Sequence, residues 1–140
     1  MIGLFKLQNI RWALFVIAYV TAELLLFSSY RGHDARFHWF THFFLGVSVA
    51  LIIMSIITWR TRKAVKLPLL WLLLAHLLAM FPDILFSVFN IAHSTNWTDF
   101  FLLHIQSHFI PGRNITWYFI FIISLGLYLW VINKRAVDHQ

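Results

Sequence analysis

Four long apolar stretches limit what this chain can fold into. They cover about residues 10–28, 40–59, 67–89 and 115–132, and their only acidic residues are Glu23 and Asp83. Each approaches the roughly 20 residues that an α-helix needs to cross the hydrocarbon of a bilayer. With 61% hydrophobic residues, the chain is too apolar to hide its side chains in a soluble core of 140 residues. We therefore expect an all-α integral membrane protein, with four transmembrane helices in a single domain over residues 1–140.

The basic residues indicate how these helices are oriented. Eight of the eleven Lys and Arg lie in the N-terminal segment, in the loop at residues 60–66 or in the C-terminal tail. Because basic loops stay on the cytoplasmic side, we expect both termini and this loop to be cytoplasmic, in the membrane of a bacterium. The net charge of +6 then belongs to loops beside anionic lipid, and we expect no nucleic-acid partner. The first stretch has no small-residue cleavage site after it, so we expect a retained helix.

The connection between the third and fourth stretches differs from the other loops. Residues 98–110 are rich in Phe, Leu and Ile, and they end before Pro111 and Gly112. Thr98 or Asp99 could cap a short helix at its N-terminus. A helix of this length cannot span the bilayer, so we predict an interfacial helix over about 98–110 at the outer face.

Histidine is frequent, and this topology gathers seven of the eight histidines toward the outer face. Ionisable groups in a membrane are costly and usually line a functional cavity. The chain has no cysteine, which leaves imidazole and carboxylate as its strong metal ligands. His38/His42 and His104/His108 have the i, i+4 spacing that places two rings on one helical face. Gly46 favours a close helix approach one turn below His42. The candidate metal ligands are His38, His42, His76, Asp83, His104 and His108.

Three of the ionisable residues sit within the apolar stretches in different settings. His76 lies near mid-membrane, where a metal ligand and a structural polar contact are both possible. Asp83 follows Pro82, which frees backbone carbonyls and kinks a helix, so its carboxylate could bind metal or act as a general base. Glu23 has no obvious partner in its own helix and needs one elsewhere, for which an imidazole is suited. Asp83 and Glu23 are the candidate catalytic residues.

Three short motifs resemble a known family. They are, in chain order, Thr41-His42 with Gly46, Phe81-Pro82-Asp83 and His104-Ile105-Gln106-Ser107-His108. Over about residues 41–108 they are similar to the LexA-binding, inner-membrane-associated metal-dependent hydrolases. The chain departs from that pattern at Leu85, where the family typically has a second acid, and at Ile105 and Ser107. The resemblance implies that the metal-site residues are His42, Asp83, His104 and His108.

We therefore predict a membrane-embedded metal-dependent hydrolase. Its metal, most simply zinc, would activate water and polarise the scissile bond. The substrate would be an ester, amide or phosphoester of a lipid or lipid-linked molecule at the outer face. His42, His104 and His108 would be ligands, with Asp83 as fourth ligand or general base and with His76 and Glu23 supporting them.

Three alternatives stay open at this point. A di-metal oxygenase of the desaturase type is indicated by the i, i+4 histidine pairs, although the chain lacks a His-His doublet. The chain could be a redox subunit that binds haem b or another pigment, or iron, with His42 and His76 as the natural axial pair. It could also be a non-enzymatic accessory subunit of a larger membrane complex, or form a homo-oligomer. Membrane lipids are expected neighbours in every case.

Overall fold

The computed structural model describes residues 2–29, 35–89, 99–102, 106–112 and 114–137; for residues 2–8, 29, 35–38, 87, 108 and 135–137 it describes the backbone alone. These parts contain four long helices and no strand. The helices are α1 (Ile2–Ser29), α2 (Ala35–Thr61), α3 (Pro68–Phe89) and α4 (Asn114–Val137).

Each of the four helices contains a stretch that is long and apolar enough to cross a membrane. These stretches are Asn9–Ser28, Trp39–Thr61, Pro68–Phe86 and Asn114–Lys134. Their ends lie within three residues of the predicted ones, and the prediction of an all-α protein with four transmembrane helices is confirmed.

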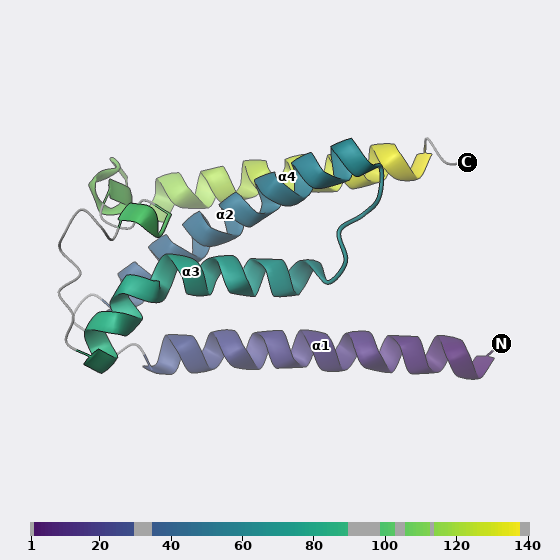
Figure 1. Cartoon of the computed structure of the whole chain (residues 1–140), viewed down its shortest axis with the longest axis horizontal. Coiled ribbons are helices and arrows are strands. Elements are labelled where there is room, and N and C mark those ends of the chain that lie inside the picture. Colours follow the sequence, from purple (N-terminus) through teal and green to yellow (C-terminus); the bar gives the residue numbers. More distant parts are fainter. Residues whose placement is uncertain (1, 30–34, 90–98, 103–105, 113, 138–140) are drawn as a thin grey trace.

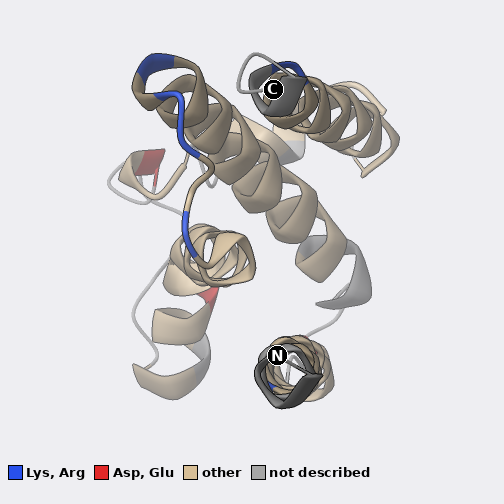
Figure 2. Ribbon diagram, turned by 90° about the vertical axis from the view of Figure 1, so that its right-hand side faces the viewer, with Lys and Arg blue, Asp and Glu red and all other residues tan. Residues whose placement is uncertain are grey.

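The helices form a bundle in which α2 is central. It packs against both α3 and α4, whereas α1 packs against α3 along the side of the bundle (Figure 1). The N-terminal end of α1 and the C-terminal end of α4 lie at the same end of the bundle, because four spans bring the chain back to the end where it started (Figure 1). Viewed from that end, Lys and Arg mark the last turn of α2 and the loop that leads into α3 (Figure 2).

Small residues allow α2 to occupy the centre. A Cβ added to Gly46 would lie 2.6 Å from the carbonyl oxygen of Ala75 and 2.9 Å from the Cα of His76. The backbones of α2 and α3 are therefore in contact at this point, as the sequence predicted for Gly46. Further along α2, Val47, Leu51 and Met54 pack against Tyr128 of α4 to form the apolar core.

Three buried serine hydroxyl groups in α2 and α4 bond to the backbone of their own helix. Ser48 and Ser55 of α2 donate to the carbonyl oxygens of the residues four positions earlier, at 2.5 and 2.7 Å. Ser124 of α4 does the same at 2.8 Å. Since the hydrocarbon offers no water, this back-bonding satisfies donors that would otherwise be costly to bury.

The connection from α3 to α4 differs from the predicted interfacial helix. Its described part contains a short 3-10 helix, η2 (Gln106–Phe109), and not one continuous helix over 98–110. Leu102 has a φ of 56°, in the left-handed region, which interrupts a right-handed helix. Asp99 does act as a cap, but its Oδ1 accepts the Gln106 amide at 3.1 Å and so caps η2. The carbonyl of Ser107 accepts the Trp117 indole N–H at 3.2 Å, which ties η2 to α4.

Candidate functional site

Two buried pairs, each of one histidine and one carboxylate, lie between the helices. The first joins α2 to α3: Nε2 of His42 is 3.2 Å from Oδ2 of Asp83. The His42 side chain is fully buried, and Asp83 is only 4% exposed. Pro82 lies inside α3, which bends toward its C-terminal end (Figure 1), as a proline inside a helix causes. Two residues from separate predicted spans are thus brought together where the protein shields both side chains from bulk water.

The second pair joins α3 to α1. Nδ1 of His76 lies 2.7 Å from Oε2 of Glu23. The His76 ring packs edge-on against Trp39 and Phe43, with ring centroids 5.2 Å away in both cases. Its Nε2 is buried and has no hydrogen-bond partner among the described residues. The ring is therefore held by Glu23 on one nitrogen and by two aromatic rings on its sides.

Glu23 meets the expectation that it needs a partner from another helix, because His76 of α3 is that partner. Tyr19, one turn earlier in α1, also interacts with the Glu23 carboxylate. The sequence analysis missed this partner, although the i, i+4 spacing of Tyr19 and Glu23 could have indicated it.

An apolar groove runs beside the second pair, between α1 and α2. It has a volume of ≈ 370 Å³, and Glu23 is the one ionisable carboxylate in its lining. Val20, Leu24 and Phe27 form its α1 side, facing aromatic residues of α2. Its size lies at the low end for ligand pockets, and its lining is suited to a hydrocarbon chain.

The four candidate residues whose side chains are described, His42, Asp83, His76 and Glu23, lie in two separate pairs. Among the side chains that the structure describes, no three His, Asp or Glu residues are close enough together to hold one metal ion. The other candidates are not placed: His104 lies outside the described residues, and for His38 and His108 only the backbone, in α2 and η2, is described.

Of the two pairs, His42 and Asp83 fit a metal ion better. Two ligand atoms on one tetrahedral ion, with bonds of roughly 2.0–2.1 Å, are about 3.3 Å apart. The 3.2 Å between Nε2 of His42 and Oδ2 of Asp83 matches that separation, and it also matches a direct ion pair. In the second pair, the 2.7 Å separation between His76 and Glu23 is instead that of a strong hydrogen bond.

A hydrogen bond links the residue before His42 to the start of α4. The hydroxyl of Thr41 donates to Oδ1 of Asn114, the first residue of α4. The short helix η2, which includes the backbone of His108, packs against α2. The sequence analysis missed the Thr41–Asn114 contact; an Asn at the start of a helix is a common cap and was the available signal.

A scan against models of protein families and searches of curated proteins and of solved structures find no match to this chain. The resemblance to the membrane hydrolases stays a prediction that rests on the three motifs.

Proposed function

We propose that this membrane protein is a metal-dependent hydrolase whose metal ion is held at the His42–Asp83 pair. One observation carries the proposal: an imidazole nitrogen and a carboxylate oxygen, buried in two different spans, lie 3.2 Å apart. Burying such groups in a membrane is unfavourable, so residues of this kind usually serve a function. Imidazole with carboxylate is a donor set that zinc, iron and manganese accept.

The remaining ligands are proposed to come from the connection between α3 and α4. His104 and His108 belong to this connection, and η2 packs against α2. The Thr41–Asn114 hydrogen bond supports this assignment, because it keeps the first turns of α2 and α4 together beside His42. We place this end of the bundle at the outer face, because the described Lys and Arg residues of α2 and of the loop into α3 gather at the opposite end.

A divalent ion bound there would act as a Lewis acid that polarises the scissile group and activates water. Asp83 would bind the ion or accept a proton. His76 has a separate part: with Glu23 ionised, its Nδ1–H donates to Oε2 of Glu23, which leaves Nε2 as the basic nitrogen. The hydrogen bond to Glu23 therefore fixes the orientation of the His76 ring beside the groove.

The groove between α1 and α2 supports a lipid or lipid-linked substrate. Its apolar lining suits an acyl or prenyl chain. Glu23 belongs both to this groove and to the second pair, which links the chain-binding surface to the ionisable residues. The proposed bond is an ester, amide or phosphoester in such a molecule.

The redox alternative is less well supported by the geometry. Because α2 and α3 touch at Gly46, one turn from His42 and against His76, a porphyrin between these two rings would have to push the helices apart. Glu23 also engages one nitrogen of His76.

The proposal is tested by elemental analysis of the purified protein. We expect about one zinc or other divalent ion per chain, lost in His42→Ala and in Asp83→Asn. His139→Ala is the matched control, because it removes a histidine of the tail. Retention of the full metal content by folded His42→Ala and Asp83→Asn protein would contradict the site.

A second candidate function is that of a non-enzymatic subunit in a larger membrane complex. It is favoured by the fact that each buried carboxylate already faces a histidine, so that the two pairs can serve to join helices. A metal-free parent protein that still requires both pairs for stability would support this candidate.

A further inference from the structure

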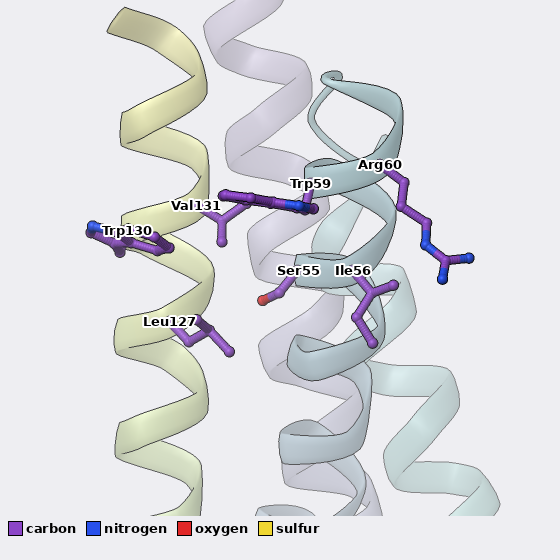
Figure 3. A pocket seen from close by; sticks show the side chains of 7 residues that line it. All are labelled: Ser55, Ile56, Trp59, Arg60, Leu127, Trp130 and Val131. Carbon is purple, nitrogen blue, oxygen red and sulfur yellow. The ribbon is translucent and has the colours of Figure 1, made fainter. Parts of the chain in front are cut away.

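A second groove lies at the opposite end of the bundle, between the last turns of α2 and α4. It has a volume of ≈ 300 Å³. Ile56 of α2 and Leu127 and Val131 of α4 supply aliphatic surface (Figure 3). The one hydroxyl in the lining, that of Ser55, donates to the carbonyl of Leu51 at 2.7 Å and so needs no ligand. The groove is therefore suited to a hydrocarbon chain.

Two tryptophans and a lysine form the terminal edge of this groove. The rings of Trp59 and Trp130 stack with centroids 6.2 Å apart and an angle of 16°. Figure 3 shows both indoles on one side of Ser55 and Leu127. The Lys134 ammonium lies over both rings, 5.3 Å from the Trp59 centroid and 5.1 Å from that of Trp130. Paired indoles and a fixed cation are typical of the level of the lipid headgroups.

Arg60 adds a second cation at the margin of the groove. It follows Ile56 by one turn, and Figure 3 shows its guanidinium turned outward, away from Trp130. No carboxylate is part of the lining. An anion at this margin would meet one guanidinium and, beside the tryptophans, one ammonium. Arg supplies the fork of N–H donors that phosphate oxygens accept, and Lys supplies a point charge.

We propose that this groove binds an anionic phospholipid, with one acyl chain along Ile56 and Leu127, the phosphate at Lys134 beside the tryptophans, and Arg60 as a second positive charge at the margin. The volume of ≈ 300 Å³ admits part of one chain and not a whole lipid, so the second chain stays in the bilayer. The charge of the edge selects an anionic headgroup over a zwitterionic one. This inference is independent of the metal site, which lies at the other end of α2.

The test is native mass spectrometry of the full chain in a neutral detergent. Phosphatidylglycerol and phosphatidylcholine with identical acyl chains are titrated separately. We expect phosphatidylglycerol to bind at least about tenfold more tightly, since each basic residue near a lipid headgroup favours the anionic lipid. The double variant Arg60→Gln/Lys134→Gln should abolish this preference. The matched control Arg62→Gln/Lys66→Gln removes the same charge from the same end and should keep the preference.

A second pair of variants tests whether the apolar lining of the groove binds the acyl chain of the lipid. Leu127→Trp fills the groove and should weaken phosphatidylglycerol binding about tenfold. Leu129→Trp, on the same helix but outside the lining, should change it less than about twofold. Equal binding of the two lipids by the parent protein would overturn the proposal. So would an equal loss of preference in both double variants, or a dimer of the chain that only Leu127→Trp dissociates.

Discussion

The two buried pairs have the same chemistry but different surroundings. His42 and Asp83 link α2 and α3, two helices whose backbones already touch at Gly46. His76 and Glu23 link α3 to α1, whose membrane span is only 6% buried, against 56% for α2. Close packing holds α2 and α3 together even without the first pair. The second pair, in contrast, supplies a large share of the contacts that hold α1 against the bundle. The comparison suggests a ligand-holding role for the first pair and a helix-anchoring role for the second.

The strongest test of this contrast removes one partner of the first pair. Asp83→Ala leaves the buried His42 facing an empty site, which should lower the free energy of unfolding by about 3–5 kcal/mol. Unfolding in detergent, followed by circular dichroism during titration with a denaturing detergent, measures the loss. If His42 and Asp83 bind zinc, added zinc should stabilise the parent and not the variant. An equal effect of zinc on both would assign the pair a purely structural role.

The second test disturbs the close contact between α2 and α3 at Gly46 and leaves His42 and Asp83 unchanged. Gly46→Ala places a methyl group against the Ala75 carbonyl, 2.6 Å away, and should cost about 1–3 kcal/mol. Gly126→Ala is the matched control, because no atom lies within 4 Å of its added Cβ. That change in α4 should be neutral or slightly stabilising. Equal losses in both variants would show that helix flexibility, and not the close crossing, is what the glycines provide.

The third test concerns the anchoring of α1. Glu23→Ala removes the hydrogen bond to His76 and the contact with Tyr19, and should destabilise the bundle by about 1–3 kcal/mol. This loss is smaller than that of Asp83→Ala because α1 is largely exposed and can move aside, which lets a polar partner reach His76. The loss should be concentrated in α1, where amide hydrogen exchange should rise while exchange in α2 and α4 stays unchanged. Glu23→Gln, which keeps an acceptor oxygen, should recover part of the protection. A uniform rise in all four helices would remove the distinction between the two pairs.

The smallest expected effect lies far from both pairs. Lys134→Gln removes the cation over Trp59 and Trp130 and should cost about 0.5–1 kcal/mol, without any change in metal content. Lys66→Gln, in the exposed loop, is the control and should change stability by less than about 0.5 kcal/mol. A larger loss in the loop variant would mean that total charge, and not the aromatic contact, matters at this end.

Individual residues show how far the sequence leads for the candidate site. The need of Glu23 for a partner in another helix could be predicted, because a lone carboxylate in hydrocarbon is unfavourable. The choice of His76 could not, since His42 and the other histidines were equally available by chemistry. The i, i+4 pairs predicted which rings share a face of one helix. They did not predict that His42 would face an acid from α3.

In the connection between α3 and α4, the sequence likewise predicted one feature, the cap, and not another, the start of the helix. Its composition predicted a capped helix at the membrane surface, and Asp99 is indeed a cap. The helix it caps begins only at Gln106, because the chain turns through a left-handed residue at Leu102. Such a turn depends on the packing of this segment against α2 and α4, which sequence patterns do not express.

The sequence by itself determined the number and extent of the spans and, through their even number, the return of both ends of the chain to one end of the bundle. These follow from length and hydropathy, which are local properties of the chain. Only the tertiary structure decided that α2 is central, that α1 lies at the side and which histidine meets which carboxylate. The physical reason is that all four spans are strongly and similarly apolar. Helix neighbours and rotations are therefore set by close packing at small residues such as Gly46 and by a few polar contacts, both of which exist only once the helices have assembled.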